Sequence, residues 1–186
     1  MSRDEPSKVL PMPPLVIVCG PPAAGKTTLA IEVSRQLRLP VLSKDDLKEA
    51  MMDHLGGAPL VGAAAFAVQF AVARELLKAG VGVVLEGAFF RDQTELSGLA
   101  ALGNAVVLSL ECSLAVLEQR FVERQDSRHP SHRGLEAIPD LRERVRRDAY
   151  GVPNLGRPVL RINTDNWLEP PEGKIILWVR RQLQAS

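Results

Sequence analysis

The segment GPPAAGKTT, residues 20–28, constrains this chain more than any other feature. Its first eight residues match G-x-x-x-x-G-K-[ST], a glycine-bounded loop whose backbone binds phosphate. The apolar run Leu15–Cys19 before the loop predicts a buried strand, and the residues from Lys26 onward predict a helix that Pro40 ends. The pattern requires this strand–loop–helix context, so a phosphate-binding loop is favoured over an unrelated glycine turn.

The residue types of the loop explain how it would hold a triphosphate. Its two glycines let the backbone curl so that consecutive N–H groups face one anion, and the helix that follows adds the positive end of its dipole. We expect Lys26 to place its charge on the β- and γ-phosphates of ATP and the Thr27 hydroxyl to coordinate Mg²⁺. The predicted nucleotide-binding residues of the loop are Gly20, Ala23, Ala24, Gly25, Lys26, Thr27 and Thr28.

Apolar runs alternate with helical segments along the rest of the chain. Further strands are predicted at residues 41–42, 81–87, 105–111 and 158–164, and helices are predicted between them and at the C-terminal end. This alternation indicates a three-layer α/β fold in which a five-stranded parallel sheet has helices on both faces. A length of 186 residues fits one domain, residues 15–186, after a loose leader, residues 1–14.

Charge and hydropathy exclude several classes of partner. The net charge of +1 gives no global argument for nucleic acid or an anionic membrane as a partner. The leader mixes charges and prolines without an apolar core, so it is not a signal peptide and a cytoplasmic protein is expected. Residues 56–73 carry no charge, but they are mostly Ala and Gly and include a proline, so no membrane span is expected there.

Two adjacent carboxylates, Asp45 and Asp46, follow the predicted second strand. Parallel strands bring their carboxyl ends to one edge of the sheet, so these side chains should lie beside the phosphate-binding loop. A hydroxyl that attacks the γ-phosphate needs a carboxylate to orient it and to accept its proton, and Asp45 is the candidate. The alternative is that Asp45 or Ser43 caps the helix that begins here.

Glu86 ends the predicted third strand and is a candidate to hold Mg²⁺ through water. A buried structural glutamate paired with an arginine is the alternative. The next side chains, Phe89, Phe90 and Arg91, are expected on the acceptor side, where aromatic faces line pockets, although core packing also explains a phenylalanine.

Arginines are dense between residues 120 and 128, where Arg120 and Arg124 share one helical face and Arg128 follows in a polar stretch with His129 and His132. Guanidinium groups that close over a transferred phosphoryl group stabilise its charge, so a lid over about residues 125–139 is predicted. A solvated basic face balanced by nearby acids is the alternative. The roles of the two histidines stay open.

The motifs GPPAAGKTTLA, SKDDLKEAM, VVLEGAF and LEQRFVERQDSRHPSH together resemble the P-loop small-molecule kinases. Within them the chain is similar to the AAA_33-type ATP-binding proteins and to chloramphenicol phosphotransferase-like enzymes. The resemblance implies a P-loop kinase fold and favours Asp45 over Asp46 as the base. It also implies that Arg120 lies against the adenine and that Arg124 or Arg128 reaches the phosphates.

These features predict an ATP- and Mg²⁺-dependent kinase that phosphorylates a hydroxyl of a small molecule. A polynucleotide 5′-hydroxyl kinase and a nucleotide-dependent switch or toxin-like regulator are the alternatives. The uncharged residues 58–73 favour an apolar acceptor such as an antibiotic, or form an interface between copies of the chain.

Overall fold

The computed structural model describes residues 12–55, 60–124, 129, 134–166 and 172–185. Its five strands are β1 (Pro14–Cys19), β2 (Val41–Ser43), β3 (Val83–Glu86), β4 (Asn104–Glu111) and β5 (Val159–Asn163). The helices among the described residues are α1 (Lys26–Leu37), α2 (Lys44–Leu55), α3 (Val61–Lys78), α4 (Thr94–Ala100), α5 (Leu114–Glu123), α6 (Ile138–Arg146) and α7 (Glu172–Gln184), and a 3₁₀ turn (Leu135–Ala137) leads into α6.

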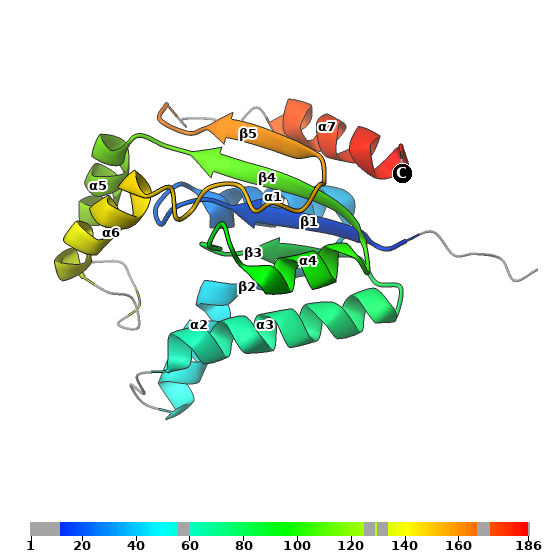
Figure 1. Cartoon of the computed structure of the whole chain (residues 1–186), viewed down its shortest axis with the longest axis horizontal. Helices are drawn as coiled ribbons and strands as arrows, with labels where there is room; N and C mark the ends of the chain where they lie inside the picture. The colour runs from blue at the N-terminus through cyan, green and yellow to red at the C-terminus, as the bar shows by residue number, and fades with distance from the viewer. Residues whose placement is uncertain (1–11, 56–59, 125–128, 130–133, 167–171, 186) are drawn as a thin grey trace, which may run out of the picture.

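The strands form one parallel sheet in the order β2-β3-β1-β4-β5. β1 is central, and its Val16 pairs with Val84 of β3 on one side and with Val106 of β4 on the other. All five strands run toward the end of the molecule where α5 and α6 lie (Figure 1). The loop after β1 and the residues that follow β2 and β3 therefore meet at one edge of the sheet.

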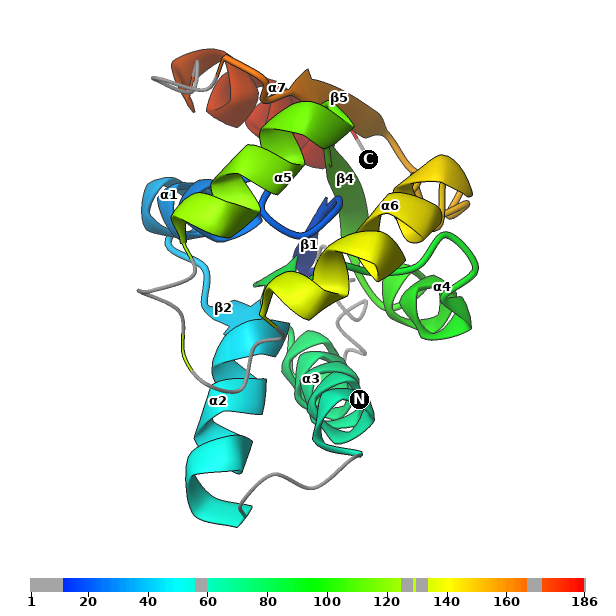
Figure 2. The same cartoon turned by 90° about the vertical axis from the view of Figure 1, so that its left-hand side faces the viewer.

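Helices cover both faces of the sheet, which confirms the three-layer α/β fold (Figure 2). α1 and α7 pack on one face, where their apolar side chains join Val16 and Val18 in one buried cluster. α3 and α4 pack on the other face with Leu15 and Ile17 in a second cluster. Successive residues of a strand point to opposite faces, so the unbroken apolar run of β1 supplies both cores.

Element boundaries differ from the predictions at two places that matter for the site. β1 begins at Pro14, one residue into the predicted leader, of which residues 1–11 lie outside the described residues. α6 begins at Ile138, inside the segment predicted as a lid loop, because the first turn of a helix tolerates Pro139. Within the predicted lid, residues 125–128 and 130–133 lie outside the described residues.

Gly20 leaves no room for a side chain. Its φ is +136°, and an added Cβ would lie 2.4 Å from the backbone oxygen of Leu110 on β4.

We expect Gly20→Ala to lower the free energy of unfolding by about 3 kcal/mol, because the cost of backbone strain adds to the cost of overpacking. Urea denaturation measures this. Gly98→Ala is the control because Gly98 is an exposed residue inside helix α4 and no neighbouring atom lies within 4 Å of an added Cβ. This substitution should slightly stabilise the protein. Equal effects of the two substitutions would contradict the tight packing at Gly20.

Candidate active site

The loop between β1 and α1 has the backbone of an anion-binding loop. Gly20 and Gly25 both have positive φ, and so does Ala23, with a φ of 66°. An alanine in this conformation costs roughly 1 kcal/mol, and such strain concentrates at functional loops. Of the predicted nucleotide-binding residues, Ala23, Gly25, Lys26, Thr27 and Thr28 line the adjoining cavity together with Pro22, whereas Ala24 is fully buried in the core.

Lys26 begins α1 and is buried, with only 7% of its surface exposed. Its ammonium donates a hydrogen bond to the backbone oxygen of Pro21, at 2.9 Å. Burial lowers the pKa of Lys26, and the nearby carboxylates of Glu86 and Asp45 oppose that shift. The charge predicted to meet the phosphates therefore sits in a dry site with acidic neighbours, where electrostatic interactions are strong.

Glu86 ends β3 opposite Lys26, and 2% of its surface is exposed. Burial raises the pKa of its carboxyl group, while Lys26 and a hydrogen bond from Ser43 act in the opposite direction. The Ser43 hydroxyl donates to Oε2 of Glu86 at 2.9 Å. Glu86 is therefore buried, but its hydrogen-bond partner is the Ser43 hydroxyl instead of an arginine, and the nearby positive charge is Lys26.

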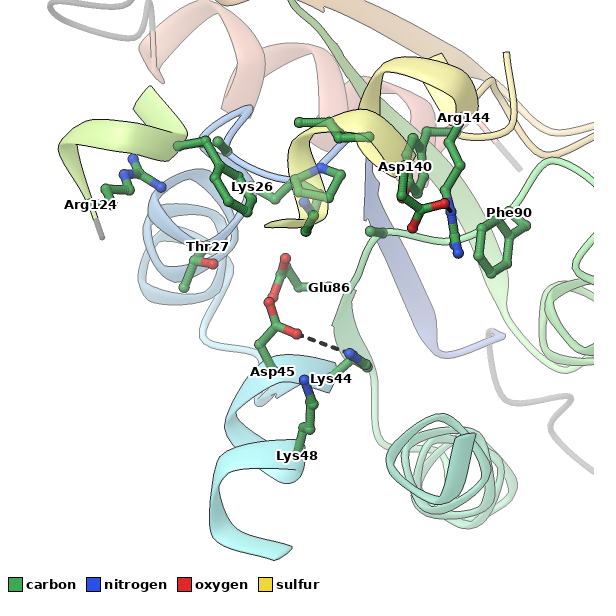
Figure 3. Close-up of a pocket in the computed structure, with 18 of the residues that line it drawn as sticks. Lys26, Thr27, Lys44, Asp45, Lys48, Glu86, Phe90, Arg124, Asp140 and Arg144 are labelled. Carbon is green, nitrogen blue, oxygen red and sulfur yellow. Dashed lines mark hydrogen bonds and ion pairs between the residues drawn. The ribbon is translucent and has the colours of Figure 1, made fainter. Parts of the chain in front are cut away.

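Ser43 also decides the start of α2. Its Oγ accepts a long hydrogen bond, 3.4 Å, from the backbone N–H of Asp46. The helix begins at Lys44, so Asp45 and Asp46 both lie in its first turn and the cap is Ser43. Asp45 is therefore not the capping residue, and its side chain lines the cavity with Lys26 and Glu86 (Figure 3).

Gln69 ties together the strand ends that carry these groups. It is fully buried on α3, and its side-chain amide donates to the backbone oxygens of Leu42 on β2 and Glu86 on β3, at 2.8 and 2.7 Å. These two bonds satisfy carbonyl groups at the carboxyl ends of neighbouring strands. Gln69 therefore positions the segments that present Ser43, Asp45 and Glu86. The sequence signal for it was one polar residue on the otherwise apolar face of α3.

The arginine-rich region divides into two roles. Arg124, at the C-terminal end of α5, lines the cavity, and its contact with the phosphates stays a prediction. Arg120 does not line it, because its guanidinium donates to the backbone oxygen of Thr164 at 2.5 Å and contacts the sulfur of Cys112. Whether the adenine lies against Arg120 stays a prediction. Arg128 and His132 lie outside the described residues, whereas His129 pairs with Asp53 of α2, with 2.9 Å between Nε2 and Oδ1.

Helix α6 supplies site residues that the sequence interpretation missed. Asp140 and Arg144 line the cavity, and Nε of Arg144 donates to Asp140 at 3.0 Å. The Arg144 guanidinium lies 5.4 Å from the ring centre of Phe90, which in turn stacks on Tyr150. The alternating charges of residues 141–147 predict a mainly solvated helix, with contact to a charged substrate as the alternative. The spacing of Asp140 and Arg144 by four residues places them on one helical face, and this was the available signal.

The predicted apolar wall, which is the uncharged segment 58–73, contributes little to the cavity. Of the residues between 58 and 73 that the structure describes, Phe66 is the one that lines it. The residues that follow Glu86 have different environments. Phe89 is fully buried in the core, whereas Phe90 lines the cavity. Arg91 forms an exposed ion pair with Asp148. The cavity, about 330 Å³ in volume, is therefore mainly bounded by the loop, the strand ends, α2 and α6.

Comparisons with known proteins support the family and the fold. The AAA_33 family, described as an AAA domain, matches residues 15–147. The chain belongs to the AAA_33 family. A crystal structure of a "putative kinase" from Chloroflexus aurantiacus J-10-fl is 33% identical, with a TM-score of 0.82 over 92% of this chain and 98% of that one. No curated protein matches significantly. The finer likeness to chloramphenicol phosphotransferases stays a prediction.

More distant structures share the fold of this AAA_33 protein. A gluconokinase from Sinorhizobium meliloti 1021 is 18% identical, with a TM-score of 0.59 over 95% of this chain and 94% of that one. A shikimate kinase from Acinetobacter baumannii in complex with shikimate is 17% identical, with a TM-score of 0.58 over 94% of each chain. At these identities the likeness establishes the P-loop kinase fold alone.

The donor atoms of the AAA_33 site fit Mg²⁺. The Thr27 hydroxyl is exposed in the cavity, and the carboxylates of Asp45 and Glu86 approach from the strand ends. The described residues contain no group of three or more His, Cys, Asp or Glu side chains able to hold a metal ion by themselves. Mg²⁺ is commonly bound by few protein ligands together with phosphates and water, so this sparse set suits it.

Among the residues that the structure describes, none of the helices combines the length and the apolar character needed to span a membrane.

Proposed function

We propose that this protein is an ATP-dependent kinase that transfers the γ-phosphate to a hydroxyl of a small molecule. The observation that carries the proposal is that Lys26 and Thr27 of the loop share one cavity with the Asp45 carboxylate. A loop alone would indicate nucleotide binding. A carboxylate across the cavity from the loop adds the group that an attacking hydroxyl requires.

In this mechanism the loop N–H groups and Lys26 would hold the phosphates. Thr27 would be a ligand for Mg²⁺, and Glu86 would hold the metal through water. The metal would supply charge neutralisation on the β- and γ-phosphates. Asp45 orients the acceptor hydroxyl and accepts its proton as the new O–P bond forms. The bond between the γ-phosphorus and the β,γ-bridging oxygen breaks, and ADP leaves. Arg124 at the end of α5 is placed to stabilise charge on the transferred group.

Isotope transfer tests the proposal without knowledge of the acceptor. The protein is incubated with Mg²⁺, ATP labelled in the γ-phosphate and a deproteinised small-molecule extract of cells. We expect label in an organic phosphate ester, absent when the Lys26→Ala variant replaces the protein. Label confined to inorganic phosphate would contradict the kinase proposal and favour a nucleotide-dependent switch. Label on an added 5′-hydroxyl oligonucleotide, but on no small molecule, would favour a polynucleotide kinase.

A further inference from the structure

The cavity has two chemically different ends. Figure 3 shows Thr27 and Arg124 toward one end, Arg144 and Phe90 toward the other, and Asp45 and Glu86 between them. The first end contains the loop and is assigned to the triphosphate under the proposed function. The second end lies beyond Asp45, so the acceptor would occupy it.

Charged side chains, and not the predicted apolar wall, dominate the second end. Lys44 and Lys48 come from α2, and Arg144 comes from α6. Asp140 is the acid that lines the same end, and Asp45 lies at its border with the loop end. Asp45 is committed to the attacking hydroxyl in the proposed mechanism. The cations of the acceptor end therefore exceed the charge that its acids supply during the reaction.

Aromatic rings hold two of these cations against the wall. The Lys44 ammonium lies 5.4 Å from the centre of the Phe66 ring and 3.1 Å from Oδ1 of Asp45. The Arg144 guanidinium lies 5.4 Å from the centre of the Phe90 ring. The Arg144 guanidinium donates from Nε to Asp140 and also interacts with Tyr150. A guanidinium carries five N–H groups, more than these two partners use. About 39% of the Arg144 side chain is exposed, which leaves it accessible to a ligand.

An acceptor that enters this end takes Lys44, Lys48 and Arg144 out of water. Removing water from a charge is costly unless an opposite charge replaces it. An oxyanion would form charge-assisted hydrogen bonds with these donors, and a neutral group would not. We propose that the acceptor is an anionic alcohol, with a carboxylate or phosphate that binds between α2 and α6 while its hydroxyl faces Asp45. This inference rests on the proposed kinase function.

The charge of the acceptor can be tested directly. The small-molecule extract is separated at neutral pH on an anion exchanger, and the retained and unretained fractions are each incubated with Mg²⁺ and γ-labelled ATP. We expect organic label in the retained fraction. Organic label in the unretained fraction alone would overturn the inference while leaving the kinase intact. Label only in inorganic phosphate from both fractions would overturn the kinase proposal itself.

A phosphatase arm separates the two sources of negative charge. The retained fraction is treated with phosphatase, which is then removed before the labelled ATP is added. A carboxylate acceptor remains a substrate after this treatment. A phosphorylated alcohol loses its phosphate and is no longer a substrate. Either result supports an acceptor that carries an oxyanion.

Substitutions then locate the anion-binding group. Arg144→Met should raise the KM for the labelled acceptor about 10- to 100-fold, as expected for the loss of a charge-assisted hydrogen bond. Arg144→Lys keeps the positive charge and should raise the KM less. Arg147→Met is the matched control, because Arg147 follows α6 with 77% of its side chain exposed and pairs with Glu143. Lys48→Met tests the opposite wall if Arg144→Met lowers the folded fraction. An unchanged KM in both Arg144→Met and Lys48→Met would overturn the inference.

Discussion

Replacement of Lys26 by methionine is expected to lower kcat/KM for phosphoryl transfer by about 10³-fold. The side chain is the buried cation of the phosphate-binding loop, and its ammonium is already desolvated beside Glu86. Loss of one preorganised electrostatic group at a transferring centre costs on the order of 10²- to 10³-fold, and this group carries a full charge. Label transfer from ATP to the acceptor measures the effect. Stabilisation by ATP and Mg²⁺ in a thermal melt should be lost as well, since binding to the native state raises Tm.

The matched control is Lys78→Met, at an exposed lysine that ends α3 and pairs with Glu75. It removes the same charge far from the cavity and should leave transfer within about twofold, as surface substitutions of this kind change little. Lys26→Met also leaves Glu86 without its nearby cation. Burial already raises the pKa of Glu86. We therefore expect the carboxyl group to become protonated in this variant, which avoids a buried unpaired charge and keeps the protein folded. Near-normal transfer by folded Lys26→Met would remove the assigned role of the loop.

Asp45→Asn should reduce kcat by about 10²- to 10⁴-fold, the range for loss of a general base. The amide keeps the size of the side chain and its ability to orient a hydroxyl, but it cannot accept the proton. Nucleotide binding should change little by comparison, because the loop holds the phosphates. Single-turnover transfer of labelled phosphate, together with the Kd for ATP and Mg²⁺, separates the two effects.

The chain supplies a matched control in the next residue. Asp46 lies in the same first turn of α2, is exposed, and does not line the cavity. Asp46→Asn should therefore retain most of the transfer rate. Equal losses from Asp45→Asn and Asp46→Asn would indicate a general effect on α2, and a larger loss from Asp46→Asn would reverse the assignment of the base.

The elements of the fold were largely predictable because their signals are local. Long apolar runs such as those of β1 and β4 indicated buried strands, and α1 begins at Lys26 as predicted. α6 begins at Ile138, inside the segment 125–139 predicted as a lid, because the first turn of a helix accepts Pro139. The capping of α2 had two candidates in the sequence. The position of the Ser43 hydroxyl between Glu86 and the Asp46 N–H selected one of them.

The sequence by itself determined the donor half of the site. The loop is built from nine consecutive residues, 20–28, so its backbone conformation and its charge are properties of a local segment. The rule that parallel strands end at one edge then brought Asp45 and Glu86 to that loop. These predictions needed only neighbouring residues and a sheet topology.

Only the tertiary structure decided the acceptor half. Lys44, Phe90 and Arg144 come from three segments that are distant in sequence, and they meet because α6 packs beyond the strand ends opposite α2. Helical periodicity shows that α6 has a polar face, but it does not show what that face meets. The same limit applies to residues 58–73, whose lack of charge suggested a pocket wall, whereas their buried side chains mainly pack α3 against the sheet. Contacts between distant segments depend on how the layers pack, and no local pattern encodes that packing.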